Sequence, residues 1–345
     1  MIRLPLYRLS ALLVVSLAAA LRWGAQWDDA LVVRPVDGQA LAGQASDEEE
    51  EEGGQEESSS SGGGPRTYQR IKKTGDRRVA SYGFQNFNRD RIEISYSIAE
   101  SQFQPYNQSF GYHKEEVAQL RVLRDKRKQQ AFADAQKKGL SQAQFNAVLA
   151  GIDKQYDADL KGYLASHGFR LDKGNVVSVD MPALVRKNAS FVKPISMEFD
   201  KFATARKYRS SEIIGAVLSF VQTALRYKQP DPVYKGKHTG GLLLPLTAVV
   251  VGWGDCDTKS GLMASILSNW GQMRMVGVGV PGHYLMGVLQ IPEKGDVFVQ
   301  HGGLQYVLVE PAGPAWFPVG QVADTTMTLL RNGGEGYRVE PFFTN

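Results

Sequence analysis

The sequence predicts an α+β protein in which helices and antiparallel strands follow one another in blocks. The strongest observation is a helical pattern over 255–270 followed by strand-like segments at 273–280, 283–291 and 304–309. Glycine-containing turns separate these segments, and strands joined by short turns usually pair antiparallel. An alternating strand at 91–98 and two long helical stretches precede them. We therefore expect a C-terminal helix-and-sheet core behind an N-terminal strand-and-helical-hairpin region.

Composition excludes several classes of protein. The chain has 345 residues, 43% of them hydrophobic, so it can bury a sizeable core and is not wholly disordered. Its one cysteine, Cys256, excludes an intrachain disulfide framework, a zinc ribbon and a thiolate-held iron–sulfur cluster. His113, His167, His238 and His301 show no metal-ligand spacing. We expect neither a metal nor a cofactor.

The net charge of +4 hides an asymmetry along the chain. Residues 1–65 carry 4 basic and 11 acidic side chains, which leaves 36 basic and 25 acidic ones, or +11, in 66–345. This excess suits an anionic envelope surface or an acidic tail, although a merely solvated basic face is the simpler interpretation. The sequence has no basic-aromatic nucleic-acid motif, so nucleic acid is not an expected partner.

The first 65 residues are predicted to direct and tether the protein. Residues 1–25 are typical of a signal peptide or membrane anchor, because Arg3 and Arg8 precede an uncharged segment at 9–21. That segment is shorter than the about 20 residues that span a bilayer. Residues 26–65 form an acidic, Ser/Gly-rich linker that we expect to be disordered. The localisation expected is exported, either periplasmic or associated with the cell envelope.

The N-terminal region, 66–200, contains the strand at 91–98 and then a polar-aromatic stretch at 99–113 that is predicted to be a loop. A charged helix is expected over 114–137. A second helix is expected from Ser141 to about residue 166, with apolar residues at helical spacing. The short connection favours an antiparallel surface hairpin. A docking site for a partner or substrate is the alternative.

The core region, 201–345, begins with a predicted helix over 211–227, capped by Ser210 or Ser211. An apolar run at 242–251 then leads to the helix that carries the cysteine.

Three residues form a candidate catalytic constellation. Cys256 opens a helix, where the helix dipole favours the thiolate. His283 begins one predicted strand, and Glu310 ends the next. If those strands pair antiparallel, the histidine and the carboxylate come into contact, as a base and its orienting acid require. The simpler alternatives are a buried apolar cysteine, a histidine that caps a turn, and an exposed glutamate at a strand end.

These residues lie in three motifs that resemble the bacterial transglutaminase-like superfamily of cysteine peptidase type, over about 205–325. The motifs, in the chain order of that family, are GWGDCDTK at 252–259, PGHYLMGV at 281–288 and YVLVEP at 306–311. The resemblance implies a papain/transglutaminase-like core, with a nucleophile helix packed on an antiparallel sheet, and a triad of Cys256, His283 and Glu310. The third residue is usually Asp in transglutaminases proper, so Asp324 is an outside candidate.

Further site residues are expected on weaker grounds. Gln222 lies on a helix like one upstream of the nucleophile in such enzymes, and could donate to an oxyanion beside the Cys256 backbone N–H. A solvent-facing helical residue is the simpler interpretation of Gln222. Trp253 could line the acyl pocket or donate its indole N–H. Asp255 and Asp257 are most simply acids at a helix N-terminus.

The function expected is an exported thiol enzyme that acts on amide bonds of proteins or peptides through an acyl-enzyme. Hydrolysis by a peptidase or amidase is favoured over crosslinking. One alternative is a catalytically silent envelope binding or scaffold protein that uses the helical hairpin. Another is a membrane-tethered module that acts on a second enzyme through its acidic linker.

Overall fold

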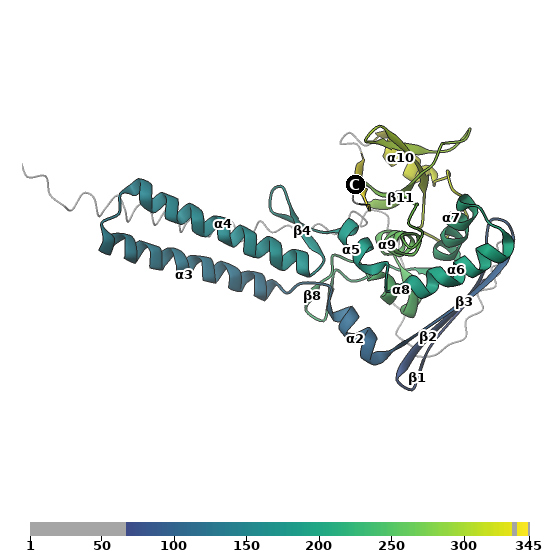
Figure 1. The fold of residues 1–345 in the computed structure, drawn as a ribbon, viewed down its shortest axis with the longest axis horizontal. Coiled ribbons are helices and arrows are strands. Elements are labelled where there is room, and N and C mark those ends of the chain that lie inside the picture. The colour runs from purple at the N-terminus through teal and green to yellow at the C-terminus, as the bar shows by residue number, and fades with distance from the viewer. Residues whose placement is uncertain (1–66, 333–336, 344–345) are drawn as a thin grey trace, which may run out of the picture.

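The computed structural model describes residues 67–332 and 337–343, which form a body and a long projecting helical arm (Figure 1). The predicted export signal at 1–25 and the predicted linker at 26–65 fall outside these residues. Within the two described ranges, no helix combines the length and apolar character needed to cross a bilayer. The α+β class with antiparallel sheets is confirmed.

The body begins with an antiparallel sheet of order β1-β2-β3, made of β1 (Tyr68–Thr74), β2 (Arg77–Gln85) and β3 (Arg91–Ala99). The predicted strand at 91–98 is therefore confirmed. Alternate residues of β2 and β3 point into the core, as the period of two requires. The buried side chains on this face include Tyr82, Phe84, Ile92, Ile94 and Ile98.

The loop predicted over 99–113 is wrong, because α2 (Glu100–Gln108) lies there. Two aromatic residues one turn apart, Phe103 and Tyr106, are buried on one face of this helix. The Tyr106 hydroxyl donates to Oδ1 of Asn188 at 2.6 Å. Tertiary contacts of these rings stabilise a helix that its polar composition does not suggest.

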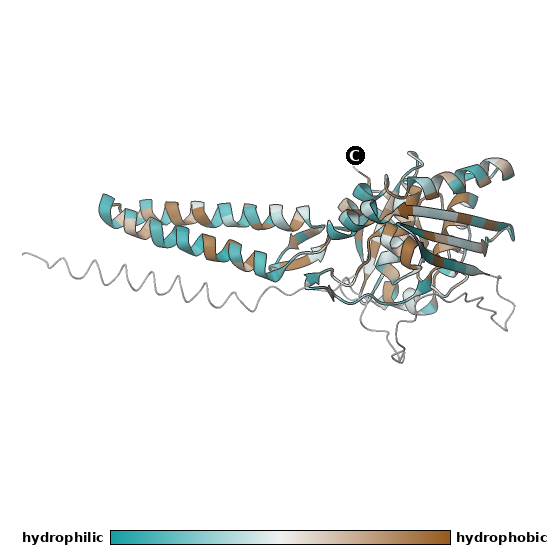
Figure 2. Ribbon diagram, turned by 90° about the horizontal axis from the view of Figure 1, so that it is seen from below, coloured by the Kyte–Doolittle hydropathy of each residue, from teal (hydrophilic) through white to brown (hydrophobic). Residues whose placement is uncertain are grey.

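The helical arm consists of α3 (Lys114–Lys138) and α4 (Gln142–Ser166), which confirms both predicted helices. Gly139 ends α3 in the left-handed conformation, at φ 60°. Ser141 begins α4 with a capping box, in which its side chain and that of Gln144 satisfy each other's backbone N–H groups. Figure 2 shows hydrophilic and apolar residues interspersed along the arm.

The chain then returns to the body through several short elements. They are β4 (Phe169–Asp172), β5 (Val176–Val179), α5 (Met181–Asn188), α6 (Lys193–Arg206), α7 (Ser210–Ser219), the π-helical turn η1 (Phe220–Ala224), β6 (Arg226–Tyr227), β7 (Val233–Tyr234), β8 (Lys237–His238), α8 (Pro245–Val251) and β9 (Trp253–Gly254).

The helix predicted over 211–227 is therefore shorter than expected and ends in η1. Its N-cap is Arg209 rather than a serine, and the Glu212 carboxylate accepts from the Arg209 backbone N–H at 2.8 Å. Leu225 adopts an extended conformation, and residues 226–227 pair with β9 in parallel. This pairing takes the end of the predicted helix into a strand beside the cysteine.

The C-terminal core places α9 (Cys256–Leu267) against a sheet of order β12-β13-β11-β10-β14. The strands are β10 (Met275–Val280), β11 (His283–Leu289), β12 (Phe298–His301), β13 (Leu304–Val309) and β14 (Arg338–Pro341), and α10 (Asp324–Asn332) precedes β14. The three predicted strands of this region are confirmed with small boundary shifts. The short outer strands β12 and β14 were not predicted.

One buried cluster joins the N-terminal sheet, the short helices and α9, and includes residues from Ala80 to Phe342. A second cluster lies between the C-terminal sheet and α10, and includes Val278, Leu285 and Leu308. The strand β11 contributes to both clusters, so it is fixed on both faces. This packing holds the start of β11 beside the N-terminus of α9.

Candidate active site

A tight turn presents Cys256 as the first residue of α9. Asp255 is the N-cap, and its carboxylate accepts from the Thr258 backbone N–H at 3.2 Å. A Cβ at Gly254 would lie 2.3 Å from Cγ2 of Thr258, so the turn needs glycine there. The segment before the cysteine is thereby fixed by its own first helical turn.

The Cys256 thiol is buried, with 2% of the residue exposed, and it donates to Oδ1 of Asp257 at 3.0 Å. Burial raises the pKa of this thiol well above its ordinary value, and the charges of Asp257 and Asp255 raise it further. A backbone hydrogen bond from Tyr284 acts in the opposite direction. In this state burial and two carboxylates therefore act against the predicted preference for the thiolate.

His283 and Glu310 are in contact, as the antiparallel pairing of β11 and β13 predicts. Nε2 of His283 lies 3.0 Å from Oε1 of Glu310, and the two side chains are 12% and 7% exposed. The Glu310 carboxylate also accepts from the Ala323 backbone N–H at 2.8 Å and the Thr326 hydroxyl at 2.9 Å. Asp324, the outside candidate, is an exposed residue at the start of α10.

These hydrogen bonds keep Glu310 ionised. Burial pushes the pKa of Glu310 upwards, but the bonds from His283, Ala323 and Thr326 hold it below its ordinary value. A carboxylate here fixes the imidazole through Nε2. The remaining ring nitrogen, Nδ1, is then the one that can accept a proton.

Tyr284 brings the histidine and the cysteine to the same place. Its backbone N–H bonds to the thiol, and its carbonyl accepts from the Ser260 hydroxyl at 3.3 Å. Both polar groups of this one residue are thus held by α9. His283 is the adjacent residue on β11, so its backbone is held at the same end of α9 as the cysteine.

Gln222 is buried in η1, with 1% of the residue exposed, so its interpretation as a solvent-facing helical residue is wrong. Its amide nitrogen donates to the carbonyls of Glu310 at 2.9 Å and Phe317 at 3.0 Å. Oε1 has no hydrogen-bond partner among the described residues. Because both amide hydrogens are already used, this arrangement does not favour Gln222 as an oxyanion donor.

Trp253 lies in β9, is partly exposed, and stands two residues before Asp255, the N-cap of α9. Nζ of Lys228 is 5.0 Å from the centroid of the Trp253 ring. The predicted role of the indole in an acyl pocket stays a prediction.

Sequence reasoning missed a buried charged cluster beneath the cysteine. Asp255 and Asp257 are the expected acids at the helix N-terminus, but they are buried, 4% and 1% exposed, and Lys259 is fully buried. Nζ of Lys259 donates to the Leu225 carbonyl at 2.9 Å and lies 5.8 Å from the Tyr227 ring centroid. Burial lowers the pKa of Lys259 to about 7 and raises that of Asp255 to about 6. The signal was three charged residues at the N-cap and in the first turn of a helix that contains no other charged residue.

Comparisons of this chain with models of protein families, with curated proteins and with solved structures find no match. In the described part of the chain, no group of three or more His, Cys, Asp or Glu side chains is placed to hold a metal ion.

Proposed function

We propose that this protein is an exported transglutaminase-like thiol enzyme that acts on amide bonds of proteins or peptides. Cys256 is the nucleophile, His283 the base and Glu310 the residue that orients the base. The observation that carries the proposal is the His283–Glu310 pair, at 3.0 Å, on the strand whose next residue bonds to the Cys256 thiol. The packing of α9 on β11 supports a papain/transglutaminase-like arrangement of the core.

The proposed reaction begins when Nδ1 of His283 takes the thiol proton and Sγ of Cys256 attacks the amide carbonyl carbon. The oxygen of the tetrahedral intermediate faces the Cys256 backbone N–H, which has no intrahelical acceptor at the first helical position. Collapse of the intermediate breaks the C–N bond. His283 gives its proton to the departing amine, and a thioester acyl-enzyme remains.

The state described here is closed. The thiol donates to Asp257, so it must turn from that carboxylate to the imidazole before it reacts. Burial of Cys256 means that a substrate must also displace the neighbouring surface. We infer that the thiol reacts only when the site opens, so that the free enzyme reacts slowly with small reagents and substrate binding favours the open state.

The acyl acceptor decides between two outcomes. Water gives a peptidase or amidase, and a lysine amine gives a crosslinking enzyme. Hydrolysis is favoured, because crosslinking needs a dedicated channel that excludes water from the acyl-enzyme.

A second function is favoured by a specific observation, the burial of Cys256 and its hydrogen bond to Asp257. A catalytically silent envelope binding or scaffold protein would keep its thiol in this way and use the arm as its docking element. The arm exposes the apolar side chains Val122, Leu123 and Val148. In that case Cys256→Ala leaves the biological activity intact, whereas alterations of the arm abolish it.

The proposed enzyme is tested with p-nitrophenyl acetate as a small acyl donor and the full chain. We expect a burst of nitrophenol, an acetyl group on the Cys256 peptide, and loss of both in Cys256→Ala and His283→Ala. Adding a lysine ester then separates hydrolysis from transfer to an amine. An acetyl group found on other residues only, with Cys256 unlabelled in folded protein, contradicts the proposal.

A further inference from the structure

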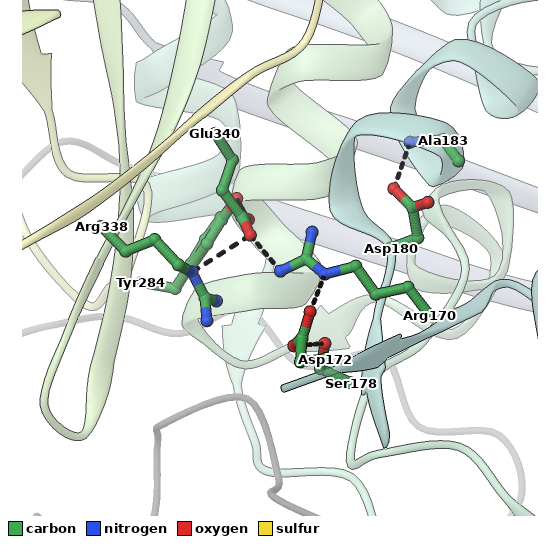
Figure 3. Close-up of polar contacts among 8 residues, drawn as sticks. All are labelled: Arg170, Asp172, Ser178, Asp180, Ala183, Tyr284, Arg338 and Glu340. Carbon is green, nitrogen blue, oxygen red and sulfur yellow. Dashed lines mark hydrogen bonds and ion pairs between the residues drawn. The ribbon is translucent and has the colours of Figure 1, made fainter. Parts of the chain in front are cut away.

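Glu340 is a buried acid that the proposed triad does not use. It lies on β14, 6% exposed, accepts hydrogen bonds from Tyr284 and Arg170, and forms an ion pair with Arg338 (Figure 3). The Tyr284 hydroxyl donates to Oε2 at 3.0 Å, and Nε of Arg338 lies 3.1 Å from Oε1. Nη2 of Arg170 donates to the same Oε1. A buried carboxylate with so many donors is held in one position.

Arg170 is itself braced on its other side. Its Nε donates to Oδ1 of Asp172 at 3.0 Å, and Oδ2 of Asp172 accepts from the Ser178 hydroxyl at 2.6 Å. The positive charges of Arg170 and Arg338 are therefore balanced by the carboxylates of Glu340 and Asp172, so the network has no net charge. Figure 3 shows the Arg170 side chain reaching from the β4–β5 hairpin towards Glu340.

The Tyr284 ring reaches Glu340 across the intervening strand β10. Gly277 of β10 is the register partner of Glu340 on one side and of Met286 on the other. A Cβ at Gly277 would lie 1.8 Å from the Tyr284 hydroxyl oxygen, so only glycine leaves room for the ring. The fold thus reserves space for this one contact.

The two ends of Tyr284 connect this network to the nucleophile. The hydroxyl end bonds to Glu340, while the backbone N–H bonds to the Cys256 thiol and the carbonyl accepts from Ser260. Tyr284 is fully buried and immediately follows His283. A displacement of its ring would therefore move both the donor to sulfur and the neighbouring imidazole.

We propose that Glu340 is a positioning residue for the nucleophile, which through the Tyr284 hydroxyl holds the His283–Tyr284 backbone against Cys256, with Arg170 and Arg338 as its counter-charges. This inference rests on the proposed function. Arg170 lies on β4, the strand that follows the arm helix α4, so this strand and Tyr284 contact the same carboxylate.

The test measures the rate of Cys256 alkylation by iodoacetamide against pH, in the full chain and in Tyr284→Phe. This variant keeps the ring and removes only the hydroxyl. We expect the alkylation midpoint to rise by about 0.5 to 1 pH unit, the equivalent of one weakened hydrogen bond to sulfur. Glu340→Gln should also raise the alkylation midpoint. The double variant, Tyr284→Phe with Glu340→Gln, should raise the midpoint no further than the larger of the two single shifts.

The matched control is Arg78→Met, which removes a comparable two-bond pair to Glu100, at 2.8 and 3.0 Å, on the N-terminal sheet. It should lower stability without moving the midpoint. If Tyr284→Phe also lowers stability with an unmoved midpoint, Glu340 is only structural and the inference is overturned. If the pH midpoint of alkylation shifts in His283→Ala but not in Tyr284→Phe, this inference is overturned and the proposed function stands. If the midpoint is unchanged in His283→Ala, the proposed function is overturned.

Discussion

The arm and the nucleophile helix are stabilised in opposite ways. Each residue of α9, from Cys256 to Leu267, is buried, including an aspartate and a lysine. Along the 25 residues of α3, the buried positions are Val117 and Ala135. The arm is held instead by its caps, by ion pairs between its helices and by the ring contact of Phe132 with Phe145, whose centroids are 6.0 Å apart. Its ion pairs are Lys128–Asp153 at 2.6 Å and Arg127–Asp159 at 3.5 Å.

This difference shows that local interactions stabilise the arm helices, whereas tertiary contacts stabilise α9. The arm helices follow from propensity, capping and charge pairing, all of which act over a few residues. The helix α9 exists because its whole circumference is covered, so its polar residues must satisfy one another inside the body. Charges that are unusual in such a place then mark the candidate site.

The largest expected effect separates the two regions by stability. Leu262→Ala, in fully buried α9, should lower the free energy of unfolding by about 3 kcal/mol, through lost burial and a cavity. Val148→Ala, at a residue of α4 that is 41% exposed, should cost less than about 0.5 kcal/mol. Urea denaturation measures both. Equal losses would show that the arm is packed as tightly as the body.

A second expected effect comes from Lys259 and appears as a pH dependence. Its pKa of about 7 in the folded protein lies below that of the unfolded chain, so the unfolded chain binds the extra proton above pH 7. The free energy of unfolding of the native protein should therefore rise relative to Lys259→Met, by about 2 kcal/mol from pH 7.5 to 9.

The comparison with Lys259→Met is needed because Cys256 acts in the opposite direction. Its raised pKa keeps a proton in the folded state that the unfolded chain loses above about pH 8.5. Both proteins contain Cys256, so the difference between their denaturation curves isolates the lysine. A difference that stays constant from pH 7.5 to 9 would mean that the Lys259 amine titrates normally.

The smallest expected effect lies in the arm. Ser141→Ala removes the capping box of α4 and should cost about 1 kcal/mol, confined to the first turns of that helix. Hydrogen exchange should show faster exchange there and unchanged exchange in α9. Gln142→Ala, at the next residue, is the control and should leave protection of the first turn nearly intact. Faster exchange spread over the whole body in Ser141→Ala would contradict a locally stabilised arm.

Much of the fold could be predicted because its signals are local. Gly139 and Ser141 mark the arm turn, and alternation marks β3. Cys256, His283 and Glu310 were found from their positions at the ends of elements, which the antiparallel pairing of β11 with β13 brings together. The contact between His283 and Glu310 was predictable without knowledge of any other strand.

The remainder depends on contacts that are distant in sequence. The helix α2 is stabilised by the packing of Phe103 and Tyr106, and β14 by pairing with β10 across the sheet. Burial of Cys256 and Lys259 follows from the covering of α9 on several sides, and no local pattern encodes it. Glu340 lies 56 residues from its partner Tyr284, so the sequence offered no signal for that pair.

The central claim is that His283, held by Glu310, activates Cys256. The most direct measurement is the rate of Cys256 alkylation by iodoacetamide near pH 7 in the full chain, in His283→Ala and in Asp257→Asn. We predict a loss of at least about tenfold in His283→Ala, because the base is gone. Asp257→Asn should be faster than the native protein, because it removes a charge that raises the pKa of the thiol. Equal rates in folded native protein and His283→Ala would contradict the account.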